Sequence, residues 1–189
     1  MIRIGILGDI GSGKSFVAKS FGHPVFNADE EVAKLYKKDK KIFKKLKKLF
    51  PKYIFSFPIK KKEVVKAVLG NKNNLKKIVK IIHLKVRKNM KLFLKKNKNK
   101  KIVILDIPLL LENKINNRKD VLVFVQSKKS DIEKRLKKRT GFNQEIIDNF
   151  RNIQLSLDYK KKKSHFVINN NFTKKSVNEG IKKVLNKIY

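Results

Sequence analysis

The chain contains no cysteine and no long hydrophobic run, and both absences limit what the protein can be. Without thiols it can form neither disulfides nor a thiolate zinc site, so a reducing compartment is expected. No apolar run approaches the roughly 20 residues that a membrane-spanning helix needs. The chain opens directly on an apolar run, Ile2 to Leu7, which leaves no room for a cleavable signal. We therefore expect a cytoplasmic protein with no membrane partner.

Acidic residues are also scarce. The 189 residues include 15 Asp and Glu against 50 Lys and Arg, which gives a formal net charge of +35. Such a field attracts polyanions, so a nucleic-acid partner is one explanation. The other is codon composition, because the lysines come with abundant Asn and Ile and spread along the chain without forming a basic stripe with interleaved aromatics. We favour the compositional explanation, and nucleic acid is not the expected partner.

The most specific motif is GDIGSGKS at residues 8–15, which fits the phosphate-binding pattern GxxxxGK[ST]. An apolar strand-like run precedes it and a helix-like run, Phe16 to Phe21, follows, which is the strand–loop–helix order that such a loop requires. The alternative, a glycine-rich turn that happens to precede a lysine, leaves this context unexplained. The pattern predicts binding of a nucleoside triphosphate.

Each residue type in the motif has a physical role in such a loop. Glycines let successive backbone N–H groups point at one anion, and the following helix adds its dipole. Lys14 would reach the β- and γ-phosphates, and the Ser15 hydroxyl would bind Mg2+. The residues expected to contact ATP here are Gly8, Gly11, Ser12, Gly13, Lys14, Ser15 and Phe16.

Carboxylates close two further predicted strands. Asp29 follows a short strand after the turn at His23-Pro24, and Asp106 ends the apolar run Ile102–Leu105. Ligands of open α/β sheets gather beyond the carboxyl ends of the strands. Asp29 is therefore placed where a reacting hydroxyl could be, and Asp106 where a carboxylate helps hold Mg2+ through water. Asp29 could also cap a helix expected at Glu30–Tyr36, and the two roles are compatible.

Residues 37–99 have a different character, with apolar residues at helical spacing on three segments. We expect a helical insertion between the second and third strands. His83 lies within it beside the apolar face. A lone histidine on a helix is more often a packing or surface residue than a ligand, so its pattern alone leaves a function open.

A fourth buried strand is expected at Val121–Val125, and after it comes a basic segment. A helix from Asp131 to Arg139 would place Arg135 and Arg139 on one face, because they are four residues apart. Such arginines could form a lid that closes over the phosphates, or the helix could be simply solvated. Asn143 is expected to cap the next helix. A last strand at Phe166–Ile168 and an amphipathic helix complete the chain.

Five blocks along the chain resemble the dephospho-CoA kinase family. They are, in order, IGILGDIGSGKS, NADEEVAKLY, LDIPLLLE, RLKKRTGF and QLSLDYKKKKSHFVIN, which ends at Asn169. The resemblance implies ATP-dependent phosphorylation of the ribose 3′-hydroxyl of dephospho-CoA. Another small-molecule or nucleotide kinase would share the loop and lid but not these blocks. A basic ATP-dependent nucleic-acid-binding protein is the third and weakest alternative.

The resemblance also implies an α/β architecture, a single P-loop kinase domain with a five-stranded parallel sheet in the order 2-3-1-4-5. The core would comprise residues 1–36 and 100–189, the CoA-binding insertion about 37–99, and the lid about 130–150. Mg2+ is the implied cofactor, ATP and dephospho-CoA are the partners, and a monomer is favoured.

The family also implies residue roles. Asp29 would orient or deprotonate the acceptor hydroxyl, with Lys14 and Arg139 completing the catalytic set. Arg135 and Arg139 would be lid arginines that contact ATP. The residues implied to bind dephospho-CoA are Asp29, Lys62, His83 and Asp106.

Three positions depart from the family pattern. Asp9 replaces the second glycine of the usual loop, and Leu84 replaces the proline that follows His83. Lys62 stands where an arginine is usual, which keeps the charge but loses the bidentate fork. These departures affect the expected CoA contacts more than the kinase assignment.

Overall fold

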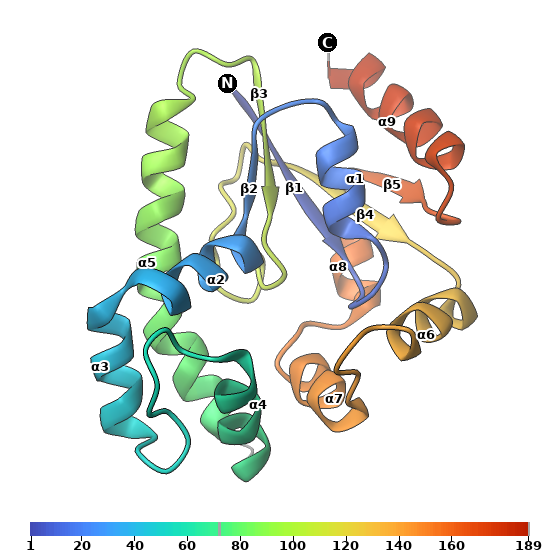
Figure 1. Cartoon of the computed structure of the whole chain (residues 1–189). Helices are drawn as coiled ribbons and strands as arrows, with labels where there is room; N and C mark the ends of the chain where they lie inside the picture. The colour runs from blue at the N-terminus through green and yellow to red at the C-terminus, as the bar shows by residue number, and fades with distance from the viewer. Residues whose placement is uncertain (72, 189) are drawn as a thin grey trace. The chain divides into compact units, whose positions relative to one another are not determined.

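Five parallel strands form one sheet in the order β2-β3-β1-β4-β5 (Figure 1), which confirms the predicted direction and order. The computed structural model describes residues 1–71 and 73–188. All five residues of β3 are buried, as expected for a sheet covered on both faces. The strands are β1 (Ile2–Gly8), β2 (Val25–Asn27), β3 (Ile102–Asp106), β4 (Val121–Gln126) and β5 (Phe166–Asn169).

The sheet register brings the strand ends that carry the sequence motifs to one edge. Gly5 of β1 pairs with Leu105 of β3, and Asn27 of β2 pairs with Asp106. On the other side, Gly8 pairs with Val125 of β4. Because all strands run in the same direction, the loop after β1 and the carboxylate that ends β3 share the carboxyl edge of the sheet, where ligands of such folds bind.

Helices cover the sheet because its faces are apolar. In Figure 1, α1 (Lys14–Ser20) lies in front of the sheet, where its side chains and those of α9 (Lys174–Ile188) form one hydrophobic cluster with β1 and β3. Behind the sheet, α8 (Leu157–Lys163) contacts β1 and β4. The residues of this hydrophobic cluster include Ile4, Ile6, Val17, Ala18, Ile102, Ile104, Val177 and Ile181.

The chain divides into two compact units. The first comprises Met1–Asn27, Leu94–Phe142 and Gln154–Tyr189, and it contains the whole sheet. The second comprises Ala28–Phe93 and Asn143–Ile153 and is helical. The helices in or extending from the second unit are α2 (Ala28–Lys38), α3 (Lys40–Leu49), α4 (Lys61–Gly70), α5 (Asn74–Lys96) and α7 (Gln144–Asn152). The helices expected from the apolar spacing of residues 37–99 are present.

Polar contacts connect the helices of the second unit. Asn89 of α5 donates to the Glu31 carboxylate of α2 over 3.0 Å, and Lys85 pairs with Asp39 over 3.1 Å. Asp39 also caps α3, because its carboxylate accepts from two backbone N–H groups of the first turn. In the same unit, α7 packs against α4. The first two helices are thereby tied to the long helix α5.

Buried Glu63 organises the segment between α3 and α4. Its carboxylate accepts hydrogen bonds from the backbone N–H groups of Phe55 and Ser56 and from the Ser56 hydroxyl. Burial alone would raise the pKa of Glu63, but these hydrogen bonds outweigh it and hold the pKa below its usual value. The connection between α3 and α4 is therefore held in place by a side chain of α4.

Two predicted helix boundaries are wrong. The helix expected from Glu30 begins at Ala28, so Asp29 is the second residue of α2 and not its cap. The helix expected to reach Arg139 is α6 (Lys129–Lys137), which ends two residues earlier, so Arg135 and Arg139 do not share a helical face. Conversely, Asn143 caps α7 as expected, accepting from the Ile146 N–H.

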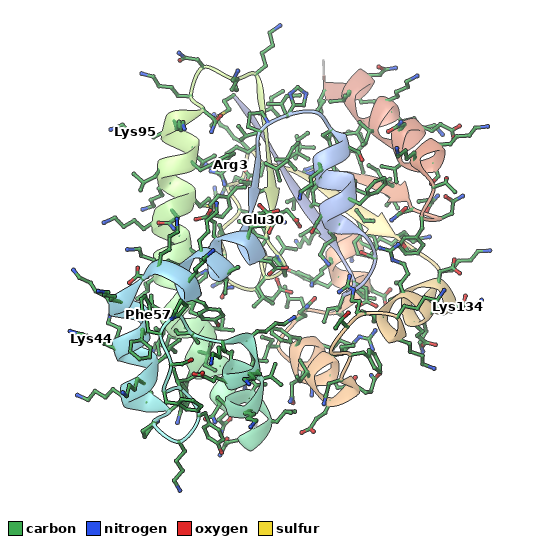
Figure 2. The ribbon with its side chains drawn as sticks, viewed as in Figure 1. Arg3, Glu30, Lys44, Phe57, Lys95 and Lys134 are labelled. Atoms are coloured by element: carbon green, nitrogen blue, oxygen red, sulfur yellow. The ribbon has the colours of Figure 1, made fainter. Side chains whose placement is uncertain are left out.

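Lysines are distributed over the surfaces of both units. Figure 2 shows Lys44 on α3, Lys95 on α5 and Lys134 on α6 extending away from their helices, and all three are exposed. In the described parts of the chain, no helix is long and apolar enough to cross a membrane.

One lysine is an exception. Lys160 of α8 is 1% exposed, and its ammonium lies 2.8 Å from the Glu112 carboxylate and donates to the Gln154 side chain over 2.7 Å. Glu112 also accepts from the Leu155 backbone N–H. The ion pair therefore joins α8 to the segment that follows β3. Charges buried in this way are tolerated because they are paired.

We expect Lys160→Met to lower the free energy of unfolding by about 3–5 kcal/mol, because it leaves the Glu112 carboxylate buried without its counter-charge. Lys161→Met, at the exposed neighbouring position, should change it by less than about 0.5 kcal/mol. Urea unfolding of both variants measures the difference. Combining Lys160→Met with Glu112→Leu should recover part of the loss, and equal effects of the two single substitutions would contradict this account.

Candidate active site

The loop between β1 and α1 has the backbone of a phosphate-binding loop. Gly11 and Gly13 both have φ of 88°, a conformation that residues with a side chain rarely adopt. Gly13 is the residue that immediately precedes α1. A side chain at Gly11 would press on Ile132 and Leu136 of α6. The glycines thus give the loop its curvature and also let α6 pack closely against it.

The charged side chains of the loop fold onto its backbone. Lys14 donates to the Gly8 and Asp9 carbonyls over 3.2 and 2.7 Å, so its ammonium lies across the loop. Asp9 accepts from the Ile10 N–H over 2.6 Å. The departure at Asp9 is accommodated because its carboxylate is used by the neighbouring backbone. Ser15 lies in the first turn of α1, and Phe16 after it is 41% exposed.

Two residues that the sequence analysis missed hold the loop from outside. The Asn170 side chain donates to the Ser12 carbonyl over 2.8 Å, and the Ser127 hydroxyl donates to the same oxygen over 3.1 Å. Both residues immediately follow strands, Asn170 after β5 and Ser127 after β4. In the sequence, each of these residues belongs to a polar run that directly follows an apolar run. That pattern could have placed both at the carboxyl edge of the sheet.

Asp106 closes β3 and is buried. Its carboxylate accepts from the Asn27 side chain over 2.7 Å, a contact that ties the ends of β2 and β3 together. No cluster of three or more Asp, Glu, His or Cys residues is present in the described part of the chain. Mg2+ does not require one, since it commonly uses one or two protein oxygens together with phosphates and water. The Asp106 carboxylate and the Ser15 hydroxyl lie at the same edge of the sheet and offer the oxygen ligands that Mg2+ prefers.

The predicted lid arginines differ in their surroundings. The guanidinium of Arg135 on α6 stacks over the Phe172 ring, 4.2 Å from its centroid. Phe172 lies between β5 and α9 and has φ of 65°, which is unusual for a residue with a bulky side chain. Arg139 is exposed in the turn after α6. Within the first unit, the loop between β1 and α1, Arg135 and the turn after β5 therefore lie together.

The other predicted residues belong to the second unit. Asp29 is exposed in the first turn of α2, two residues after the end of β2. Lys62 is exposed in the first turn of α4. His83 lies in the middle of α5, and its buried Nε2 has no hydrogen-bond partner within residues 1–71 and 73–188. Burial lowers the pKa of His83, and the charge of Arg87 lowers it further, so the imidazole is neutral at pH 7.

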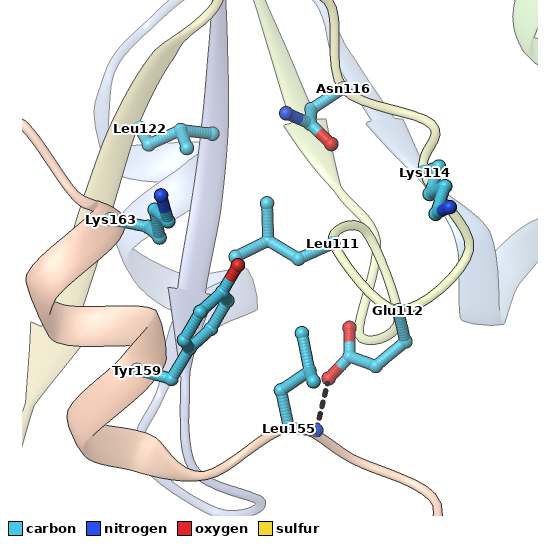
Figure 3. Close-up of a pocket in the computed structure, with 8 residues that line it drawn as sticks. All are labelled: Leu111, Glu112, Lys114, Asn116, Leu122, Leu155, Tyr159 and Lys163. Atoms are coloured by element: carbon cyan, nitrogen blue, oxygen red, sulfur yellow. Dashed lines mark hydrogen bonds between the residues drawn. The ribbon is translucent and has the colours of Figure 1, made fainter.

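A separate cavity of about 440 Å³ lies between the segment after β3 and α8, at Leu111, Glu112, Tyr159 and Lys163 (Figure 3). None of the predicted site residues lines it. In Figure 3 one Glu112 oxygen accepts from the Leu155 N–H, while Oε2 has no partner among the described residues. This cavity is distinct from the loop after β1.

The chain is similar to known proteins along nearly its whole length. The family model for dephospho-CoA kinase matches residues 2–176. A dephospho-CoA kinase of Wolbachia pipientis wMel is 34% identical over 190 aligned positions, which cover 98% of this chain and 97% of the relative. The crystal structure of TT1252 from Thermus thermophilus superposes with a TM-score of 0.74 at 27% identity, covering 100% of this chain and 98% of that one.

A second solved structure supports the fold. Dephospho-CoA kinase from Campylobacter jejuni superposes with a TM-score of 0.61 at 22% identity, and the alignment covers 98% of this chain and 96% of that one. The family assignment rests on the match along nearly the whole sequence, and the sheet order and the glycine loop are consistent with it. The chain belongs to the dephospho-CoA kinase family.

Proposed function

We propose that this protein transfers the γ-phosphoryl group of ATP to the ribose 3′-hydroxyl of dephospho-CoA, giving coenzyme A and ADP. Membership of a kinase family makes the chain a phosphotransferase. The observation that carries the proposal is the loop between β1 and α1, with the Lys14 ammonium lying across it at the carboxyl edge of the sheet. A fixed positive charge in that position suits a transferring phosphoryl group.

In the proposed site, the loop of residues 8–15 binds the phosphates of ATP. Its backbone N–H groups hold the anion, and Lys14 moves from the Gly8 and Asp9 carbonyls to the β- and γ-phosphates. Ser15 and Asp106 would hold Mg2+, with Asp106 acting through water. When bound, that ion neutralises charge on the phosphate oxygens. Arg135 and Arg139 contribute further positive charge from the lid, about residues 130–150.

Asp29 acts on the acceptor. Its carboxylate accepts a hydrogen bond from the 3′-hydroxyl and aligns the oxygen with the γ-phosphorus. The new O–P bond forms as the bond to the bridging oxygen of ADP breaks, and Asp29 takes the hydroxyl proton late in the step. Asp29 is exposed in the first turn of α2, which leaves its carboxylate accessible to a substrate.

The helical insertion, about residues 37–99, supplies the binding surface for dephospho-CoA. Lys62 is an exposed cation at the start of α4 and suits a phosphate of this substrate. His83, neutral at pH 7, would form a hydrogen bond to the substrate through its Nε2, which is buried and has no partner among the described residues. Leu84, in place of the family's proline, is exposed and leaves the helix unbroken through His83.

One assay tests the assignment. ADP release is measured with ATP, Mg2+ and one acceptor at a time: dephospho-CoA, adenosine, nucleoside monophosphates or a single-stranded oligonucleotide. Dephospho-CoA should be the best acceptor by kcat/KM. Faster turnover with a nucleoside monophosphate would favour another small-molecule kinase, and ATP hydrolysis stimulated only by the oligonucleotide would overturn the proposal.

We expect Lys14→Ala to reduce turnover by about a hundredfold or more, because loss of a fixed charge on the phosphates costs several kcal/mol of transition-state stabilisation. Lys19→Ala is the matched control, since it removes the same charge from the exposed end of the same helix. Its turnover should be close to that of the unaltered protein. If Lys14→Ala kept more than about a tenth of the rate, the loss would be only ~1.4 kcal/mol and the assigned role would be wrong.

Asp29→Asn should retain ATP binding and lower kcat with dephospho-CoA by about a hundredfold or more, the usual effect of removing a general base. Glu30→Gln is the control, because it removes a carboxylate from the same first turn and should leave kcat nearly unchanged. Each change weakens the favourable interaction with the helix dipole by less than about 1 kcal/mol, so thermal midpoints should be similar. Equal turnover of the two variants in stable preparations rules out the catalytic role of Asp29.

A further inference from the structure

Both polar atoms of the Asn170 side chain are hydrogen-bonded beside the glycine loop. It is 2% exposed, and its backbone N–H donates to the Gln126 carbonyl at the end of β4 over 2.7 Å. Its side-chain Oδ1 accepts from the Phe172 N–H over 2.8 Å, while Nδ2 donates to the Ser12 carbonyl. Its position is therefore fixed by the sheet on one side and by the turn before α9 on the other.

The close approach of Asn170 depends on a glycine. A side chain at Gly13 would overlap the Asn170 amide nitrogen, so only glycine lets the amide reach the loop backbone. The same glycine has the positive φ that begins α1. Gly13 of the motif thus serves a contact with residue 170 as well as the curvature of the loop.

The contact determines which way one peptide group faces. The Ser12 carbonyl and the Gly13 N–H belong to the same planar trans peptide and point in opposite directions. Asn170 and Ser127 both draw the carbonyl oxygen outward, toward the ends of β4 and β5. The Gly13 N–H is therefore directed to the opposite, inner side of the loop, where a phosphate-binding loop presents its N–H groups to the anion.

We propose that Asn170 is a positioning residue for nucleotide binding, which holds the Ser12–Gly13 peptide so that its N–H faces the phosphates. This inference rests on the proposed function in one respect, namely that the bound nucleotide is the phosphate donor. Asn170 acts through the backbone of the loop and needs no contact with the nucleotide itself.

The same residue connects the loop to a predicted lid arginine. Its Oδ1 holds the turn in which Phe172 adopts its positive φ, and the Phe172 ring supports the Arg135 guanidinium. Backbone conformations of this kind persist only where the surroundings enforce them. Asn170 thereby sets the loop and the platform beneath Arg135 from one point.

Asn170→Asp isolates the contact with Ser12. The new side chain has the same size and keeps an acceptor for the Phe172 N–H, but it turns the donor into an oxygen facing the Ser12 carbonyl. Titration calorimetry with ADP and Mg2+, well below the thermal midpoint, should show affinity weakened by about tenfold or more. Asn169→Asp adds the same charge at the neighbouring exposed position and should bind ADP as the unaltered protein does. Affinities of the two variants within about threefold of each other would overturn the proposal.

A double-mutant cycle provides an independent test and does not depend on the added charge. Ser127→Ala removes one donor to the Ser12 carbonyl and Asn170→Ala removes the other, so either single variant leaves that oxygen with one of the two bonds. Removing both should weaken ADP binding by more than the product of the single effects. Strictly multiplicative losses would show that the two residues do not act through the same carbonyl and would contradict the inference.

Kinetics separate this proposal from the proposed function. In steady state, Asn170→Asp should raise the KM for ATP while leaving the KM for dephospho-CoA unchanged, whereas a purely structural defect would lower the active fraction without changing either KM. ADP binding requires no acceptor. If the unaltered protein did not phosphorylate dephospho-CoA but Asn170→Asp still lost ADP affinity, the assigned substrate would fail and the role of Asn170 would stand.

Discussion

The positive-φ backbone of the loop after β1 is the constraint on which the rest of the site depends. Gly11 and Gly13 can adopt it because they have no side chains, and the same lack of side chains admits α6 on one side and Asn170 on the other. The strands are paired in parallel register, which places the ends of β1, β3, β4 and β5 at one edge of the sheet. A phosphate-binding geometry therefore results from backbone and packing before any charge is considered.

Much of the sheet and the glycine loop could be predicted from the sequence. The strands could be found because a parallel sheet covered on both faces needs continuous apolar runs, and the glycine loop because its context of strand and helix is strict. The ends of the helices were harder to predict from the sequence. The helix boundaries near Asp29 and Arg139 were predicted about two residues from their positions, because the start of α2 and the end of α6 depend on local hydrogen bonding that residue spacing does not encode.

The contacts that support the loop could not be predicted in the same way. Asn170 and Ser12 are separated by 158 positions, and only the folded sheet brings them together. The same holds for the joining of Asn143–Ile153 with Ala28–Phe93 into one compact unit, since the sequence suggested a helical insertion at residues 37–99 alone. The family resemblance gave the order of the strands, whereas apolar spacing gave only their positions.

The few acidic residues have a consequence for how this sequence can drift. In a chain of net charge +35, the carboxylates of Asp39, Glu63 and Glu112 each hold a separate piece of backbone or a lysine in place. The lysines next to these positions in sequence are exposed, and their side chains are solvated. Additional lysines at such solvated positions therefore disturb few contacts, whereas lysine in place of Asp39, Glu63 or Glu112 would remove a hydrogen bond or an ion pair that holds the structure.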